Sequence, residues 1–197
     1  TEFQRGILAR DANGGWSVPL TIPNAANGPH NINAYGNVTL AGATANVSQS
    51  VGHAFSIAPT SGGVGTSVTV NGSCFYAYET GIQALFNGTA ISSGITAGAN
   101  GTLSTTFTIP ATARGSYLTT AQGSTTTTSQ VPGKTFVLAP TVSISPISGY
   151  AGQVVSVKGA GFAGSSVVSI TYDGTAVTAT PASIVSTASG NVSGSFM

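Results

Sequence analysis

Two stretches of the chain repeat one another, and this repetition constrains the fold more than any other feature of the sequence. Residues 57–91 return as residues 144–177 after one deletion, so that Pro59 and Pro146 lie 87 residues apart. The matched pairs are mostly prolines, glycines and apolar residues: Pro59/Pro146, Gly62/Gly149, Gly65/Gly152, Val68/Val155, Val70/Val157, Gly72/Gly159, Phe75/Phe162, Phe86/Tyr172 and Gly88/Gly174. Self-similarity at a fixed period predicts a repeat architecture.

A second stretch repeats with the same shift. Residues 11–36 return as residues 98–123, with Ile22-Pro23 matching Ile109-Pro110, and residues 189–197 give a partial third echo. We therefore expect three parts: the rear half of a repeat (residues 1–56), a complete repeat (residues 57–140) and the front portion of a repeat (residues 141–197). Incomplete first and last repeats would leave unpaired strand edges, which invite pairing with another chain.

The local pattern is that of β-strands throughout. Apolar and polar residues alternate at 16–22, 67–70, 103–109, 142–144 and 155–157, as expected of half-buried strands. Asn87-Gly88 and Asp173-Gly174 each follow a short predicted strand and predict tight hairpin turns. Residues 123–130 predict a loop or a Thr-rich edge strand. No stretch carries a capped, helical apolar stripe, so the fold class is predicted to be all-β.

The repeated motif itself resembles a known family. The pattern I-x-P-x-x-G-x-x-G-x-x-V-x-V-x-G-x-x-F, followed by F/Y-[ND]-G-T-A, is similar to immunoglobulin-like repeats of the IPT/TIG type in prokaryotic cell-surface proteins, with an archaeal source favoured. The element N-G-x-[WL]-S-x-x-[LF]-T-I-P looks like the second half of such repeats. This resemblance implies tandem immunoglobulin-like β-sandwiches of about 87 residues, the first and last of them incomplete, and it covers nearly the whole chain.

The composition narrows the function class. Charged residues make up 5% of the chain and the net charge is +1, against roughly 25% charged residues in ordinary soluble domains. Nucleic acid needs a basic surface and anionic membranes attract polybasic segments, so neither is an expected partner. No apolar run approaches the roughly 20 residues of a membrane-spanning helix. An uncharged polar surface favours an extracellular location at the cell surface.

We find no set of residues that predicts catalysis or cofactor binding. The acidic residues are Glu2, Asp11, Glu79 and Asp173, and no two of them form a motif for acid–base chemistry. A calcium site built mainly from carbonyl oxygens is a minor alternative. We therefore expect no enzyme activity, no bound metal and no cofactor.

The remaining reactive side chains also have simple structural interpretations. His30 and His53 lie outside any metal-binding motif, and His30 aligns with Tyr117, which favours a packing or edge position. The single cysteine, Cys74, excludes an intrachain disulfide and is predicted to be a buried free thiol. Trp16 aligns with Leu103 and is predicted to be a core residue. Sugar stacking on Trp16 or on Tyr76 and Tyr78 is the alternative.

Sequons for N-glycosylation are the most frequent chemical motif in the chain. They predict acceptor sites at Asn37, Asn46, Asn71, Asn87, Asn100 and Asn191. Because serine and threonine are abundant, several sequons arise by chance. We nevertheless expect at least one glycan if the source is an archaeon or a eukaryote.

Two functions fit these features. The first is a structural subunit that self-associates into a filament, pilus-like thread or S-layer by β-strand complementation, in which one copy's strands complete the next copy's incomplete repeat. The joining strands would contain Trp16, Val18, Leu20, Ile22, Val142, Ile144, Val185, Val192 and Phe196. The alternative is an adhesin or carbohydrate-binding stalk segment of a larger cell-surface protein.

Overall fold

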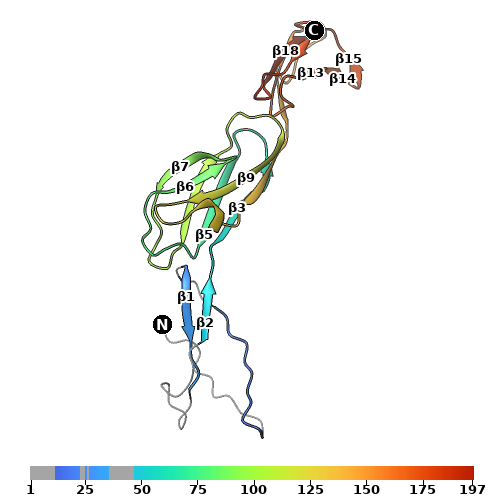
Figure 1. The fold of residues 1–197 in the computed structure, drawn as a ribbon. Helices are drawn as coiled ribbons and strands as arrows, with labels where there is room; N and C mark the ends of the chain where they lie inside the picture. The colour runs from blue at the N-terminus through green and yellow to red at the C-terminus, as the bar shows by residue number, and fades with distance from the viewer. Residues whose placement is uncertain (1–11, 23–24, 26, 36–46) are drawn as a thin grey trace.

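The computed structural model describes residues 12–22, 25, 27–35 and 47–197, and these form an all-β fold with several antiparallel sheets. The elements follow one another along the chain as three groups. Figure 1 shows a two-stranded ribbon at one end, a larger two-sheet body in the middle and a group of short strands at the other end. We call them the N-terminal ribbon, the central sandwich and the C-terminal unit.

The N-terminal ribbon consists of β1 (Gly28–Ile32) and β2 (Val47–Val51), paired antiparallel. The central sandwich contains one sheet of order β3-β5-β8 and a second of order β4-β10-β9-β6-β7. Its strands are β3 (Ala54–Ala58), β4 (Ser61–Gly62), β5 (Ser67–Ser73), β6 (Ile82–Phe86), β7 (Thr89–Ile95), β8 (Leu103–Thr108), β9 (Gly115–Gln122) and β10 (Lys134–Leu138). The β4–β10 pair is parallel and the other pairs are antiparallel.

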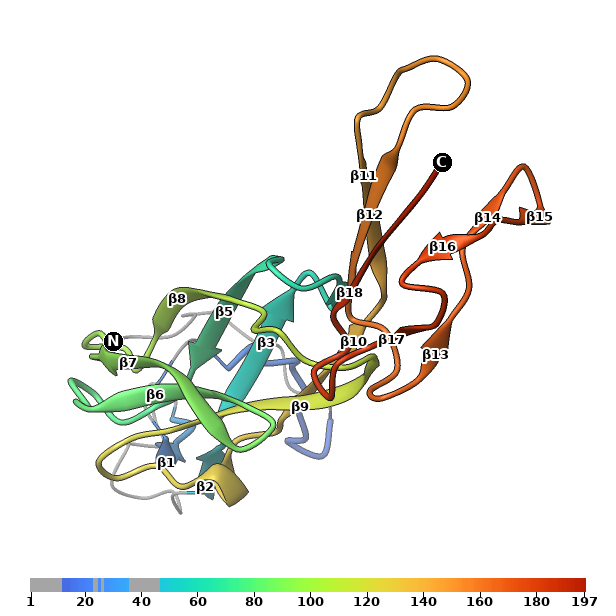
Figure 2. The same ribbon diagram turned by 90° about the horizontal axis from the view of Figure 1, so that it is seen from above.

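The C-terminal unit has a sheet of order β11-β12-β18-β16 and two small two-stranded pairs, β13–β17 and β14–β15. Its strands are β11 (Thr141–Ser145), β12 (Val155–Ala160), β13 (Val167–Val168), β14 (Thr171–Tyr172), β15 (Thr175–Ala176), β16 (Ala179–Thr180), β17 (Ile184–Val185) and β18 (Val192–Phe196). Seen from above, the β11–β12 and β14–β15 hairpins appear as two separate arms of the C-terminal unit (Figure 2).

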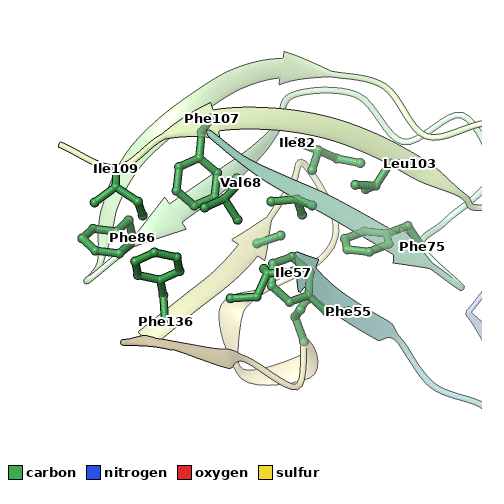
Figure 3. Close-up of a cluster of buried hydrophobic side chains, with 14 of the residues drawn as sticks. Phe55, Ile57, Val68, Phe75, Ile82, Phe86, Leu103, Phe107, Ile109 and Phe136 are labelled. Atoms are coloured by element: carbon green, nitrogen blue, oxygen red, sulfur yellow. The ribbon is translucent and has the colours of Figure 1, made fainter. Parts of the chain in front are cut away.

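A hydrophobic core fills the space between the two sheets of the central sandwich (Figure 3). The alternating strands supply it: β3 turns Phe55 and Ile57 inward, β5 turns Val68 and Val70 inward, and Phe136 of β10 closes it from the opposite sheet. A fully buried aliphatic or aromatic side chain contributes roughly 1.5–3 kcal/mol. This core is therefore the main source of stability in the described chain.

The predicted turns are confirmed. Asn87 and Gly88, with φ of 51° and 79°, connect β6 to β7, and Asp173 and Gly174, with φ of 48° and 77°, connect β14 to β15. Positive φ at both central positions is what a tight hairpin needs. Residues 123–130 form a loop that ends in a short 3₁₀ turn, η2 (Thr128–Gln130), instead of an edge strand.

The prediction of a strand at residues 16–22 is wrong for this structure, in which those residues pair with no described strand. The matching residues of the central sandwich form β8, which is held by its hydrogen bonds to β5. A strand exists only where its backbone groups find a neighbour. In the described part of the chain, residues 16–22 have no such neighbour.

The repetition extends from sequence to strand register. Gly28 faces Val51 in the ribbon as Gly115 faces Leu138 in the central sandwich, each 87 residues on. The β11–β12 pair likewise repeats β3–β5: Ser145 faces Ser156 as Ala58 faces Thr69. The ribbon therefore reproduces the β9–β10 pair, and β11, β12 and β18 reproduce the β3-β5-β8 sheet.

The connections between the groups also repeat. The N–H of Asn27 donates to the carbonyl of Phe75 at 3.4 Å, and 87 residues later the N–H of Arg114 donates to the carbonyl of Phe162 at 3.0 Å. Both joints also hold a glycine against the phenylalanine backbone, because Phe75 N–H donates to Gly101 and Phe162 N–H donates to Gly190. The contact between the ribbon and the central sandwich therefore uses the same backbone hydrogen bonds as the contact between the central sandwich and the C-terminal unit.

Candidate assembly face and the buried polar cluster

The C-terminal unit exposes side chains whose counterparts are core residues in the central sandwich. In β3, Phe55 and Ile57 are 4% and 6% exposed, whereas the register-matched Val142 and Ile144 of β11 are 61% and 48% exposed. Strand pairing does not explain this difference in exposure, because β11 pairs with β12 in the same register as β3 pairs with β5. It arises because the described residues place no second sheet over β11 and β12 comparable to the one that covers β3 and β5.

The same contrast continues across the unit. Phe86 at the end of β6 is 4% exposed, and its counterpart Tyr172 at the end of β14 is 68% exposed. Tyr172 contacts Phe196, with 6.1 Å between ring centroids. We call the side chains of this surface the open face; it consists of Val142, Ile144, Val155, Ile170, Tyr172 and Phe196.

The two faces of the N-terminal ribbon differ, and only one of them carries aliphatic side chains from both strands. By its match to β9 and β10, the side of the ribbon that corresponds to the core-facing side carries His30, Ile32, Val47, Gln49 and Val51. The opposite side carries Pro29, Asn31, Ser48 and Ser50. Val47 is exposed and Val51 and Ile32 are half-buried. Among the strands that the structure describes, β1 and β2 pair only with each other.

The predicted joining residues thus fall into different surroundings. Val142 and Ile144 lie on the open face, Val185 of β17 is exposed, Phe196 is half-buried and Val192 is buried within the C-terminal unit. The side chains of Trp16, Val18, Leu20 and Ile22 are all 42–54% exposed. The prediction that Trp16 is a core residue is therefore wrong for this structure, for the same reason that residues 16–22 form no strand.

A buried polar cluster lies where the ribbon meets the central sandwich. The carboxylate of Glu79 accepts hydrogen bonds from the backbone of Thr125 (2.8 Å) and Thr126 (2.6 Å) and from the Thr126 hydroxyl (2.7 Å). Because that hydroxyl donates to Glu79, it accepts from Nε2 of His53, 3.0 Å away. His53 Nδ1 then accepts from the side-chain amide of Asn27 at 3.0 Å.

This chain of hydrogen bonds fixes a neutral His53 with its proton on Nε2. Burial lowers the pKa of His53, and the negative charge of Glu79 opposes this only in part. Burial raises the pKa of Glu79, but the hydrogen bonds from Thr126, Thr125 and Tyr76 together outweigh it and hold the pKa below its usual range. The cluster thus links the 123–130 loop and Asn27, which directly precedes the ribbon, to the same part of the central sandwich.

Sequence reasoning missed this cluster. Glu79 and Thr126 are 47 residues apart, and no local motif connects them with His53 or Asn27. The Glu79 carboxylate and the Thr126 hydroxyl are occupied by hydrogen bonds within the cluster, which favours a structural role. In the part of the chain that the structure describes, no three His, Cys, Asp or Glu residues gather closely enough to hold a metal ion.

The other predicted residues lie at the surface or in loops. Asn71, Asn87, Asn100 and Asn191 are exposed, whereas Asn37 and Asn46 lie outside the described residues. Cys74 is buried and unpaired, as predicted. Tyr78 is exposed, but the ring of Tyr76 packs near His53, with 6.3 Å between centroids. His30 lies on the exposed ribbon strand β1.

Within the described ranges, no helix is both long and apolar enough to cross a membrane. Comparisons of the chain with family models, with curated protein sequences and with solved structures return no match.

Proposed function

We propose that this protein is a structural extracellular surface protein whose immunoglobulin-like units polymerise head to tail, through β-strand complementation, into a filament, pilus-like thread or S-layer. Two features of the central sandwich support the immunoglobulin-like assignment. Its sheets have the order β3-β5-β8 and β4-β10-β9-β6-β7. The hydroxyl of Tyr117, near the start of β9, donates to the carbonyl of Ala113 at 2.6 Å, as the tyrosine corner of such sandwiches does.

The open face is the observation that carries the proposal. Its side chains have the register of a sandwich interior, yet Val142, Ile144 and Tyr172 are exposed. Val155, Ile170 and Phe196 are half-buried. Contiguous exposed apolar surface of this kind marks an interaction site or promotes aggregation. Covering it with a second sheet would bury Val142 and Ile144 as Phe55 and Ile57 are buried in the central sandwich.

The N-terminal ribbon is the matching cover. It reproduces the register of β9–β10, which supply the second sheet of the central sandwich. Strand addition supplies main-chain hydrogen bonds for affinity, and alternate side chains set the register. One copy therefore contains both the surface that needs a second sheet and a strand pair of the kind that forms one.

The repeated joints favour a linear polymer. The two joints along one copy use matching backbone hydrogen bonds, which involve Phe75 and Gly101 at the first joint and Phe162 and Gly190 at the second. The ribbon of a neighbouring copy, placed on the C-terminal unit, would therefore continue the same stacking of units. A head-to-tail contact whose rotation does not close yields an open filament. The small charge of the chain and its four exposed sequons agree with an extracellular, glycosylated polymer.

Charge substitutions on the two faces of β11 test this function. V142D/I144D places two carboxylates on the open face, whereas S143D places one on the opposite side of the same strand. We expect the parent protein and S143D to form threads or sheets in negative-stain electron microscopy and V142D/I144D to remain monomeric. Polymers of parental length from V142D/I144D, or a parent protein that never polymerises, would contradict the proposal.

A further inference from the structure

We infer that the N-terminal ribbon of one copy occupies, on the C-terminal unit of the next copy, the position that β9–β10 occupy in the central sandwich. The inference rests on the proposed polymerisation and specifies its partner segment and register. Ribbon and C-terminal unit lie at opposite ends of the molecule (Figure 1), so the ribbon that completes a C-terminal unit comes from a second copy.

The position of β1 follows from the pairing of β9 with β6. In the central sandwich, Ala121 faces Ala84 and Thr119 faces Phe86. The segment of the C-terminal unit that matches β6 is 168–172, because Tyr172 faces Thr175 as Phe86 faces Thr89. In the junction, Ala34 of one copy therefore faces Ile170 of the next, and Ile32 faces Tyr172, in antiparallel pairing.

The position of β2 follows from the parallel pairing of β10 with β4. Val137 faces Ser61, and the N–H groups of Val137 and Ala139 donate to the carbonyls of Thr60 and Gly62, both at 2.9 Å. The counterparts of Val137 and Ala139 are Ser50 and Gly52. Their N–H groups would donate to Ile147 and Gly149 of the neighbouring copy, which are exposed and form no strand in the described chain.

Three side chains that would meet at the centre of this junction are all more polar than their counterparts in the central sandwich. In the central sandwich the Phe86 ring packs against Tyr117 and Phe136, with centroids 4.9 Å and 6.3 Å apart. Their counterparts are Tyr172, His30 and Gln49. A glutamine in a purely apolar interior would leave its amide without hydrogen-bond partners, which is unfavourable. The Tyr172 hydroxyl and the His30 ring supply such partners at the matching positions.

Cysteine cross-linking tests the register. Ser50 faces Ser148 of the neighbouring copy by analogy with Val137 and Ser61, and paired strands lie about 5 Å apart. That separation falls in the range of about 4.4–6.8 Å that a disulfide bridges between Cα atoms. Ser48 lies two residues, roughly 7 Å, farther along the same face of β2. S50C/S148C is therefore the test variant and S48C/S148C its matched control. Both variants keep the buried Cys74.

Under mild oxidation we expect S50C/S148C polymers to yield a ladder of dimers, trimers and higher species on non-reducing gels. The ladder should be on the order of tenfold stronger than that from S48C/S148C, should disappear with reductant, and should be absent when only S50C or only S148C is introduced. A second pair, N33C/T171C, reports on the residues that directly follow β1, because the matching Thr120 faces Leu85.

The possible failures can be told apart. Normal polymers that give no ladder with either register-matched pair, or an equal or stronger ladder with S48C/S148C, would overturn the register while leaving polymerisation intact. A parent protein that does not polymerise would overturn both the register and the proposed function. Circular dichroism of each variant confirms that the β fold is retained.

Discussion

Ile57 and Ile144 occupy the same register position in two units, and replacing each by alanine should have opposite consequences. Ile57 is 6% exposed in β3 and Ile144 is 48% exposed in β11. We predict that I57A destabilises the monomer and that I144A weakens the polymer while leaving monomer stability nearly unchanged.

The expected magnitudes follow from burial. Replacing a fully buried isoleucine by alanine costs about 2–5 kcal/mol, so the free energy of unfolding should fall by that amount in I57A. Ile144 is half exposed in the monomer, and I144A should cost less than about 1 kcal/mol there. If the junction buries Ile144 as the core of the central sandwich buries Ile57, I144A should lose about 1–3 kcal/mol of association free energy per junction. This corresponds to a roughly 5- to 150-fold higher critical concentration.

Two measurements separate these effects. Urea unfolding of monomers gives the free energy of unfolding, and sedimentation over a range of protein concentrations gives the critical concentration. S143A, on the outward side of β11, serves as the control and should change neither quantity by much. A critical concentration unchanged in I144A, or a monomer destabilised by I144A as strongly as by I57A, would refute the reasoning.

Three further predictions concern the central sandwich and the sequons. Folding lowers the pKa of both Glu79 and His53. Each group therefore contributes to folding stability above its ordinary pKa, and this contribution is lost as the pH falls from the ordinary pKa through the lowered pKa of the folded protein. Urea unfolding should therefore show stability declining below the ordinary histidine range and again below the ordinary carboxylate range, with H53Q losing the first decline; a constant free energy of unfolding from pH 8 to pH 3 would count against the cluster. G101A should destabilise the protein by clearly more than G88A, because both glycines have positive φ but only at Gly101 would a Cβ overlap the Phe75 backbone; equal shifts in thermal unfolding would disprove this. Glycopeptide mass spectrometry of native material should find glycan on at least one of Asn71, Asn87, Asn100 and Asn191, and four unmodified sites would contradict it.

Local pattern predicted much of the fold. The alternation at 67–70, 103–109 and 155–157 corresponds to β5, β8 and β12, and the Asn-Gly and Asp-Gly turns lie where expected. The 87-residue repeat also carries over into pairing register. These features depend on side-chain spacing and turn chemistry, which a single sequence contains.

Features that depend on distant partners could not be predicted in the same way. Residues 16–22 have the pattern of a strand, but pairing decides whether a strand forms, and no described neighbour pairs with them. The alternation at 142–144 likewise predicted a half-buried strand, whereas every residue of β11 is exposed. Glu79 is an isolated acid in the sequence, and only the fold brings the Thr126 hydroxyl to it and His53 to that hydroxyl.

The most direct test of strand complementation is a helical reconstruction of the polymer from native material at a resolution that separates β-strands. It should show two sandwich units per copy, one continuous in a single chain and one composite, with residues 32–35 of one copy antiparallel to residues 169–172 of the next. A C-terminal unit whose open face is covered by its own chain, by a different segment of the neighbour or by no protein would contradict the account.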